Sequence, residues 1–89
     1  MYSSRMSRPA LTARQRLQGQ RLARSLRRSR EASGRSAEEV ARKAKVSVET
    51  VRSIESERTP NPGFLTVVYL AVELSLDLNE LAAKATRRR

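Results

Sequence analysis

The stretch SAEEVARKAKVSVETVRSIE, residues 36–55, specifies the fold of this chain. Ser36 with Glu39 has the spacing of a capping box, in which the serine side chain accepts a hydrogen bond from a backbone amide of the first helical turn. Ser47 is a second N-cap residue, and valine and isoleucine side chains follow it at the three-residue spacing of one helical face. The stretch therefore predicts two short helices, over residues 37–44 and 48–56.

Two capped helices joined by so short a turn are typical of the helix–turn–helix motif, in which the second helix enters the major groove of DNA. The spacing alone also fits a plain helical bundle, because such bundles have short connections too.

Three further helices are expected around this pair. Asn61 followed by Pro62 is typical of a helix start, and Asp77 with Glu80 forms another capping pair. Gly34 is placed to end the first helix. No segment alternates with the period of two that a half-buried strand shows. We therefore predict an all-α, compact five-helix domain, with helices over about 18–33, 37–44, 48–56, 62–74 and 78–85.

Residues 1–17 are expected to be a basic arm. Thr12 with Gln15 has the spacing of a helix cap, but the helical face before Gln18 is nearly polar. Gly19 also disfavours a helix interior by about 1 kcal/mol relative to alanine. The expected organisation is an arm over 1–17, a domain over 18–85 and a basic tail over 86–89.

The positive charge is concentrated in the first third of the chain. The formal net charge is +10, and residues 1–35 hold ten arginines against one acid, Glu31. Residues 36–62 hold five basic and five acidic groups, and residues 63–89 hold four basic and three acidic groups. Such a distribution predicts binding to a polyanion, most simply nucleic acid. The alternative is a solvated tail whose charge only aids solubility.

Composition excludes several classes of protein. The chain has no cysteine and no histidine, which rules out disulfides, cysteine or histidine metal ligands and hydrolases that depend on either residue. Its carboxylates do not cluster at ligand spacing, so no metal and no cofactor is expected. No apolar run approaches the roughly 20 residues of a membrane span, and the start lacks the apolar stretch of a secretory signal. We expect a cytoplasmic protein without enzymatic activity.

Several residues in a common register accompany the predicted helices. They are Arg30 ahead of Gly34, Ser36 with EEVA after it, VS at 46–47, IE at 54–55, Pro62, and SLDLNEL at 75–81. Through them, residues 22–82 resemble the Cro/CI-type (xenobiotic-response-element, XRE) helix–turn–helix family, which includes lambdoid phage repressors. The resemblance implies a lambda-repressor-like DNA-binding domain, with the segment 48–56 as the recognition helix in the major groove.

The exposed side of this recognition helix is expected to read base edges. Glu49 can accept from the amine of cytosine, Arg52 can read a guanine or hold a phosphate, and Val48 can meet a thymine methyl group. Ser53, one turn beyond Glu49, is the fourth candidate. For Glu49 an alternative stays open, because the helix dipole favours a carboxylate in the first turn without any DNA.

The resemblance also implies a structural ion pair. Members of the family commonly pair an arginine in the position of Arg30 with a glutamate in the position of Glu55. Other positions depart from the family pattern. Lys45 stands where the turn often has glycine, so a left-handed conformation there would be strained. Arg35 replaces a frequent leucine, which predicts a thinner core around the first helix, and Glu73 replaces a frequent glycine.

Further contacts are expected with the DNA backbone and with a second copy. The phosphate candidates, by resemblance and by their place at caps and in the loop after the recognition helix, are Arg30, Ser36, Ala37, Ser47, Arg58, Thr59 and Asn61. The arm is expected to follow the minor groove through Arg5, Arg8, Arg14 and Arg16. An inert tail, or an arm packed on a partner subunit, is the alternative. A two-fold contact on DNA is expected at Leu76 and Leu78, unless both leucines simply fill the core.

The leading interpretation is a sequence-specific DNA-binding transcriptional regulator, a repressor that binds double-stranded DNA as a homodimer. An antitoxin that represses its own operon, with a toxin as its protein partner, is compatible with the same features. A coactivator-type helix–turn–helix module that contacts another regulator is the alternative from a different class of protein.

Overall fold

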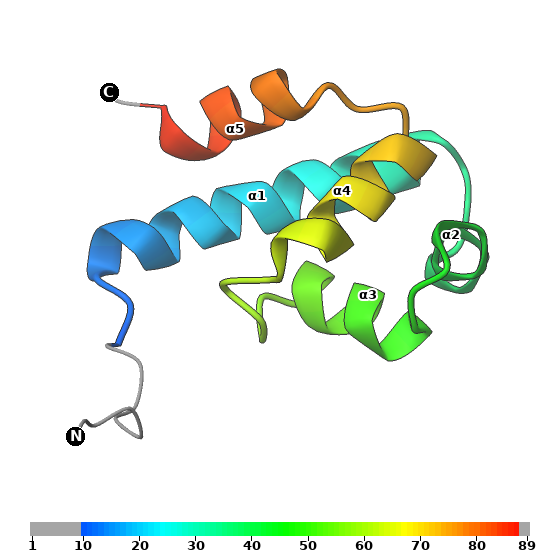
Figure 1. Ribbon diagram of the computed structural model, residues 1–89, viewed down its shortest axis with the longest axis horizontal. Coiled ribbons are helices and arrows are strands. Elements are labelled where there is room, and N and C mark those ends of the chain that lie inside the picture. Colours follow the sequence, from blue (N-terminus) through cyan, green and yellow to red (C-terminus); the bar gives the residue numbers. More distant parts are fainter. Residues whose placement is uncertain (1–9, 88–89) are drawn as a thin grey trace.

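The computed structural model describes residues 10–87, which form five helices and no strand (Figure 1). The longest helix, α1, lies along the molecule, and α5 lies beside it and runs back toward its N-terminal half. Arg21 of α1 joins the two helices, because its guanidinium donates to the carbonyl of Arg87, the C-cap of α5, at 2.8 Å. The helices are α1 (Ala13–Ala32), α2 (Ala37–Ala44), α3 (Val48–Glu55), α4 (Phe64–Glu73) and α5 (Leu78–Thr86).

All five helices contribute to one small apolar core. Its largest fully buried side chains are Leu26, Val40, Val51 and Ile54, and no polar or charged residue among residues 10–87 is fully buried. Because α2 and α3 bury the apolar positions that their sequences repeat at three- and four-residue intervals, their opposite faces point into solvent. The remaining core residues are Ala23, Ala41, Ala44, Leu70, Ala71 and Leu81.

The first helix begins earlier than the sequence predicts. Residues 13–17 belong to α1 and not to the arm, because Thr12 and Gln15 form a reciprocal capping box. The Thr12 hydroxyl accepts from the Gln15 amide at 3.0 Å, and the Gln15 side chain accepts from the Thr12 amide at 2.9 Å. These two bonds satisfy backbone donors that a helix end otherwise leaves exposed.

The start of α4 also differs from the expectation. Gly63 is its N-cap and Phe64 its first residue, so Asn61 does not cap it and Pro62 is not its first residue. The preceding loop is held on α3, where the carbonyl of Ser53 accepts from the amides of Arg58 and Thr59 at 3.0 and 3.1 Å. This anchoring keeps the chain in a loop past the proline. The other helix ends lie within one residue of their predicted positions.

Candidate nucleic-acid interface

The turn between α2 and α3 has a left-handed residue. Lys45 ends α2 with φ 64° and ψ 39°, and the amide of Val46 donates to the carbonyl of Ala41 at 3.0 Å. Such a C-cap normally carries glycine, and a side chain in this conformation costs about 1–2 kcal/mol. The strain expected at Lys45 is therefore present. The sharp turn lets α3 start at once, with the hydroxyl of Ser47 accepting from the amide of Thr50 at 3.0 Å.

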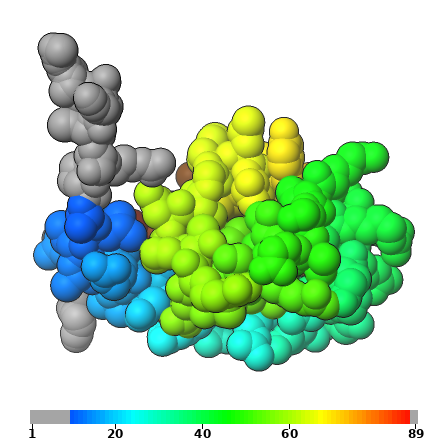
Figure 2. All heavy atoms as spheres, turned by 90° about the horizontal axis from the view of Figure 1, so that it is seen from below, coloured from blue at the N-terminus to red at the C-terminus, as the bar shows by residue number. Residues whose placement is uncertain are grey.

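The α3 helix buries one face and exposes the other. Val51 and Ile54 lie in the core, whereas Glu49 and Arg52 are exposed. Val48 is partly buried against the core, so only part of its side chain is accessible to a ligand. In Figure 2, α3 and the loop after it lie on one face of the molecule. This face is where the candidate base-reading side chains gather.

Both charged side chains of this face are paired with opposite charges. Arg52 contacts the carboxylate of Glu38 on α2, and Arg58 donates to Glu49 at 3.1 Å. Both pairs are largely exposed, so each contributes at most ~1 kcal/mol to stability. Glu38 was not among the predicted site residues. Its partner lies 14 residues away, across the turn, and no local pattern signals such a contact.

A stronger ion pair fixes α3 to α1. Arg30 donates to both carboxylate oxygens of Glu55, at 2.8 and 2.9 Å, and also to the carbonyl of Arg35 at 2.8 Å. The two paired side chains are only 16% and 12% exposed. The hydrogen bond to Glu55 raises the pKa of the Arg30 guanidinium above its usual value, so Arg30 stays charged. Because three of the five N–H donors of Arg30 are engaged and its side chain is largely buried, this geometry favours its structural role over the predicted phosphate contact.

Two departures from the family pattern compensate each other. Arg35, in the loop before α2, donates to the Glu73 carboxylate at 2.7 Å and to the Glu73 carbonyl at 3.1 Å. The second bond satisfies a carbonyl at the C-terminal end of α4, where a helix leaves such groups without partners. An ion pair between the two unusual residues thus joins the loop before α2 to the end of α4.

A comparison with family models agrees with this geometry. A model described as a helix-turn-helix domain matches residues 21–83, which is more than half of the chain. The chain belongs to this helix–turn–helix domain family. The family consists of XRE-like domains, in agreement with the Cro/CI-type resemblance of the sequence. A search of curated proteins gave no match. Membership in this family suggests a DNA-binding regulator.

The remaining phosphate candidates of the helix–turn–helix domain lie around α2 and the loop after α3. Ser36 caps α2 through its hydroxyl, which accepts from the amide of Glu39 at 3.0 Å, and the helix N-terminus also presents the amide of Ala37. The hydroxyl groups of Thr59 and Ser53 form a hydrogen bond of 2.6 Å. Ser53 is half-buried, and its hydroxyl is therefore engaged with the loop after α3. Asn61 is exposed.

The four arginines predicted for the arm are in different settings. Arg14 and Arg16 lie in the exposed first turn of α1, where the guanidinium of Arg16 donates to the carbonyl of Leu11 at 3.4 Å. Arg5 and Arg8 lie outside the described residues.

The two leucines predicted for dimer contact differ in exposure. Leu76 is partly buried and packs against the core, which agrees with the alternative of a core role for this residue. Leu78, at the start of α5, is 39% exposed and lines an apolar groove of about 680 Å³ with Phe64 of α4. Of the two leucines, Leu78 is therefore the more accessible to a second chain.

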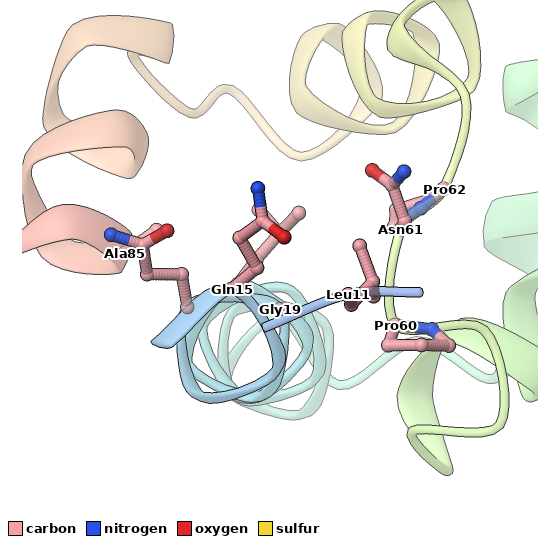
Figure 3. A pocket seen from close by; sticks show the side chains of 9 residues that line it. Leu11, Gln15, Gly19, Pro60, Asn61, Pro62 and Ala85 are labelled. Carbon is pink, nitrogen blue, oxygen red and sulfur yellow. The ribbon is translucent and has the colours of Figure 1, made fainter. Parts of the chain in front are cut away.

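A neighbouring groove of about 320 Å³ lies between the start of α1, the loop before α4 and the end of α5 (Figure 3). Its lining includes Gln15, Pro60 and Asn61, and no ionisable side chain. In the same region Gly19 meets the backbone of Pro60, with no room for a Cβ atom. This close approach explains why α1 carries a glycine in its interior.

Residues 10–87 hold no group of three or more acidic, histidine or cysteine side chains that could bind a metal ion. None of the helices in this part of the chain is both long and apolar enough to cross a membrane.

Proposed function

We propose that this chain is a sequence-specific, non-enzymatic transcriptional regulator that represses genes in the cytoplasm by binding double-stranded DNA through α3. The proposal rests on one observation, which is how α3 is held in the domain. Its inner face is fixed by the core and by the Arg30–Glu55 pair, while Glu49 and Arg52 project from its outer face. A rigidly held helix can present side chains to base edges in a fixed register.

The proposed base contacts are made by Glu49 and Arg52, with smaller contributions from Val48 and Ser53. Backbone contacts come from the amide end of α2, the caps Ser36 and Ser47, and the loop residues Arg58, Thr59 and Asn61. Arginine in the major groove is suited to guanine, and a carboxylate is suited to the amine of cytosine. For these contacts Arg52 must leave Glu38, and Glu49 must leave Arg58, so that each can bind DNA instead.

The first experiment is selection of bound sequences from a random duplex library, followed by affinity measurements at two salt concentrations. We expect an enriched palindrome and a steep fall of affinity with salt, by about 0.9 log units per phosphate contact for each tenfold rise in salt. Arg52→Ala should weaken binding to the selected site by about 1–3 kcal/mol more than binding to random DNA. The control is Arg42→Ala, which removes an equal charge from the exposed end of α2. Equal effects of both variants would refute base reading by Arg52.

The acid paired with Arg52 gives a second test. Glu38→Gln should release Arg52 and raise affinity for random duplex DNA several-fold, by removing repulsion from phosphates. Glu80→Gln changes the net charge equally but lies on α5, so it should leave the affinity closer to that of the unmodified chain. A similar rise in both variants would show that only the net charge matters.

We further propose that the chain pairs on its operator through Leu78 and the neighbouring Phe64, which together offer an apolar surface to a second copy. Such a small isologous contact is weak in solution and gains from simultaneous binding to two half-sites. Leu78→Glu should therefore keep the fold but abolish cooperative binding to a full palindrome. Unchanged cooperativity in a folded variant would exclude this contact.

A further inference from the structure

The α4 helix has more apolar surface than the domain covers. Of its ten residues, FLTVVYLAVE, only Leu70 and Ala71 are buried. Leu65 is 60% exposed, Tyr69 47% and Val72 73%. A helix that is apolar nearly all round is normally covered by other protein, and large exposed apolar patches mark interaction sites.

These three side chains follow one another along one side of α4. Their spacing of four and three residues places them in a stripe on the helix surface. Beside this stripe, Val68, Tyr69 and Val72 line a groove of about 570 Å³ that is closed on its other side by the end of α2. A stripe with an adjoining groove can accept the apolar side chains of a second helix, as in helix-in-groove recognition.

The charges around the groove determine which helix would fit. Lys43 and Lys45 line it, and neither ammonium group forms an ion pair or a hydrogen bond within residues 10–87. Among the described residues the groove has one carboxylate, that of Glu73, which is already paired with Arg35. The rim is therefore positive, and it favours carboxylates on the partner.

Neither DNA nor a second copy satisfies this surface. DNA offers charge but no apolar face that would cover the three exposed side chains. A second copy has the same net charge of +10, and a two-fold contact would bring the same two lysines into one interface. An apolar stripe flanked by acidic side chains is the complementary surface.

We propose that the Leu65–Tyr69–Val72 stripe of α4 and its lysine rim dock an amphipathic, acidic helical segment of another protein. This contact is independent of DNA binding, because it uses α4 and the end of α2 and none of the α3 side chains. It would give the domain a protein partner in addition to its operator.

The test adds each of three synthetic helical peptides to the full chain and follows the chemical shifts of the chain by nuclear magnetic resonance. The first peptide combines a leucine stripe with glutamates, the second has lysines in place of the glutamates, and the third has glutamates without the leucine stripe. We expect the first peptide to bind, with shifts at Tyr69, Val72 and Lys45. The lysine peptide should not bind, and the all-polar acidic peptide should not shift α4.

Matched variants identify the contact. The double variant Lys43→Gln, Lys45→Gln should weaken binding of the acidic amphipathic peptide by about 2- to 30-fold, the range for two exposed ion pairs. Val72→Ser should weaken binding of this peptide by about tenfold, because it removes one methyl group and replaces the other by a hydroxyl at a contact that the peptide would bury. The control Leu17→Ser, which removes an exposed apolar side chain of α1, should leave the affinity unchanged.

Four results would overturn the proposal. Equal binding of the lysine peptide would show that the lysine rim does not select acidic partners. Failure of the first peptide to bind would show that the stripe is not a docking surface for such helices. Shifts confined to α3 would show that the peptide only mimics DNA. Concentration-dependent shifts of α4 in the chain alone would assign the stripe to a second copy.

Discussion

Replacing Glu55 by glutamine should destabilise the domain more than any other removal of a single acid among the described residues. The variant keeps the shape of the side chain but leaves the charge of Arg30 without its counter-ion. Because both side chains are only 16% and 12% exposed, water compensates this change poorly. Removing one partner of a fully buried pair costs about 3–5 kcal/mol.

The expected cost here is somewhat lower, since the glutamine oxygen can still accept one of the two hydrogen bonds that join the pair at 2.8 and 2.9 Å. We expect a decrease of ~2–3 kcal/mol in the free energy of unfolding. For a domain of this size that lowers Tm by roughly 8–24 °C. The measurements are thermal unfolding followed by circular dichroism and urea unfolding analysed by linear extrapolation.

The matched control is Glu57→Gln. Glu57 lies 3.6 Å from Arg24 in a more exposed pair, so its removal should change stability by less than ~0.5 kcal/mol. The raised pKa of Arg30 means that its contribution is fully present below the ordinary arginine pKa and disappears only as pH rises through the raised value. The titration of Arg30 therefore adds no pH dependence between neutral and moderately alkaline pH. Equal and small effects of the two glutamine variants would refute the assignment of Glu55 to a structural pair.

Two further substitutions, each with a control, and one truncation test features of the fold and the arm. Gly19→Ala should lower stability by about 1–3 kcal/mol although alanine favours helix, because its Cβ would collide with the loop before α4. Gly63→Ala, whose Cβ would meet only the Thr66 hydroxyl at 4.0 Å, should change the free energy of unfolding by less than ~1 kcal/mol in the same thermal assay. Lys45→Gly should raise the free energy of unfolding by up to ~1 kcal/mol, and Tm with it, because relief of the left-handed conformation exceeds the extra conformational entropy that glycine loses on folding. Lys43→Gly, inside α2, should lower stability by a similar amount. Deletion of residues 1–10 keeps the cap of α1 and should reduce the slope of duplex affinity against salt by about one unit for each phosphate that the arm no longer neutralises, with the preferred sequence unchanged. An unchanged slope would show that these residues do not bind DNA.

The number, type and approximate bounds of the helices follow from the amino-acid sequence alone. Ser36, Ser47 and Asp77 cap their helices as expected, since a cap needs only a side chain and an amide two or three residues away. The apolar spacing around Val51 and Ile54 likewise defined the inner face of α3, and thereby its exposed one. The Arg30–Glu55 pair followed from the family resemblance and not from any local rule.

Which distant groups meet depends on the tertiary packing. Arg35 and Glu73 are 38 residues apart, and their compensation is visible only once α4 packs beside the loop before α2. The same holds for Gly19, where local propensity argued against a helix and the close approach of Pro60 requires a residue without a side chain. Local signals act within about one helical turn, through backbone amides and side chains on the same face. Contacts across turns and between helices depend on how the apolar faces pack together, and that packing set the pairing of charges around α3 and left one face of α4 uncovered.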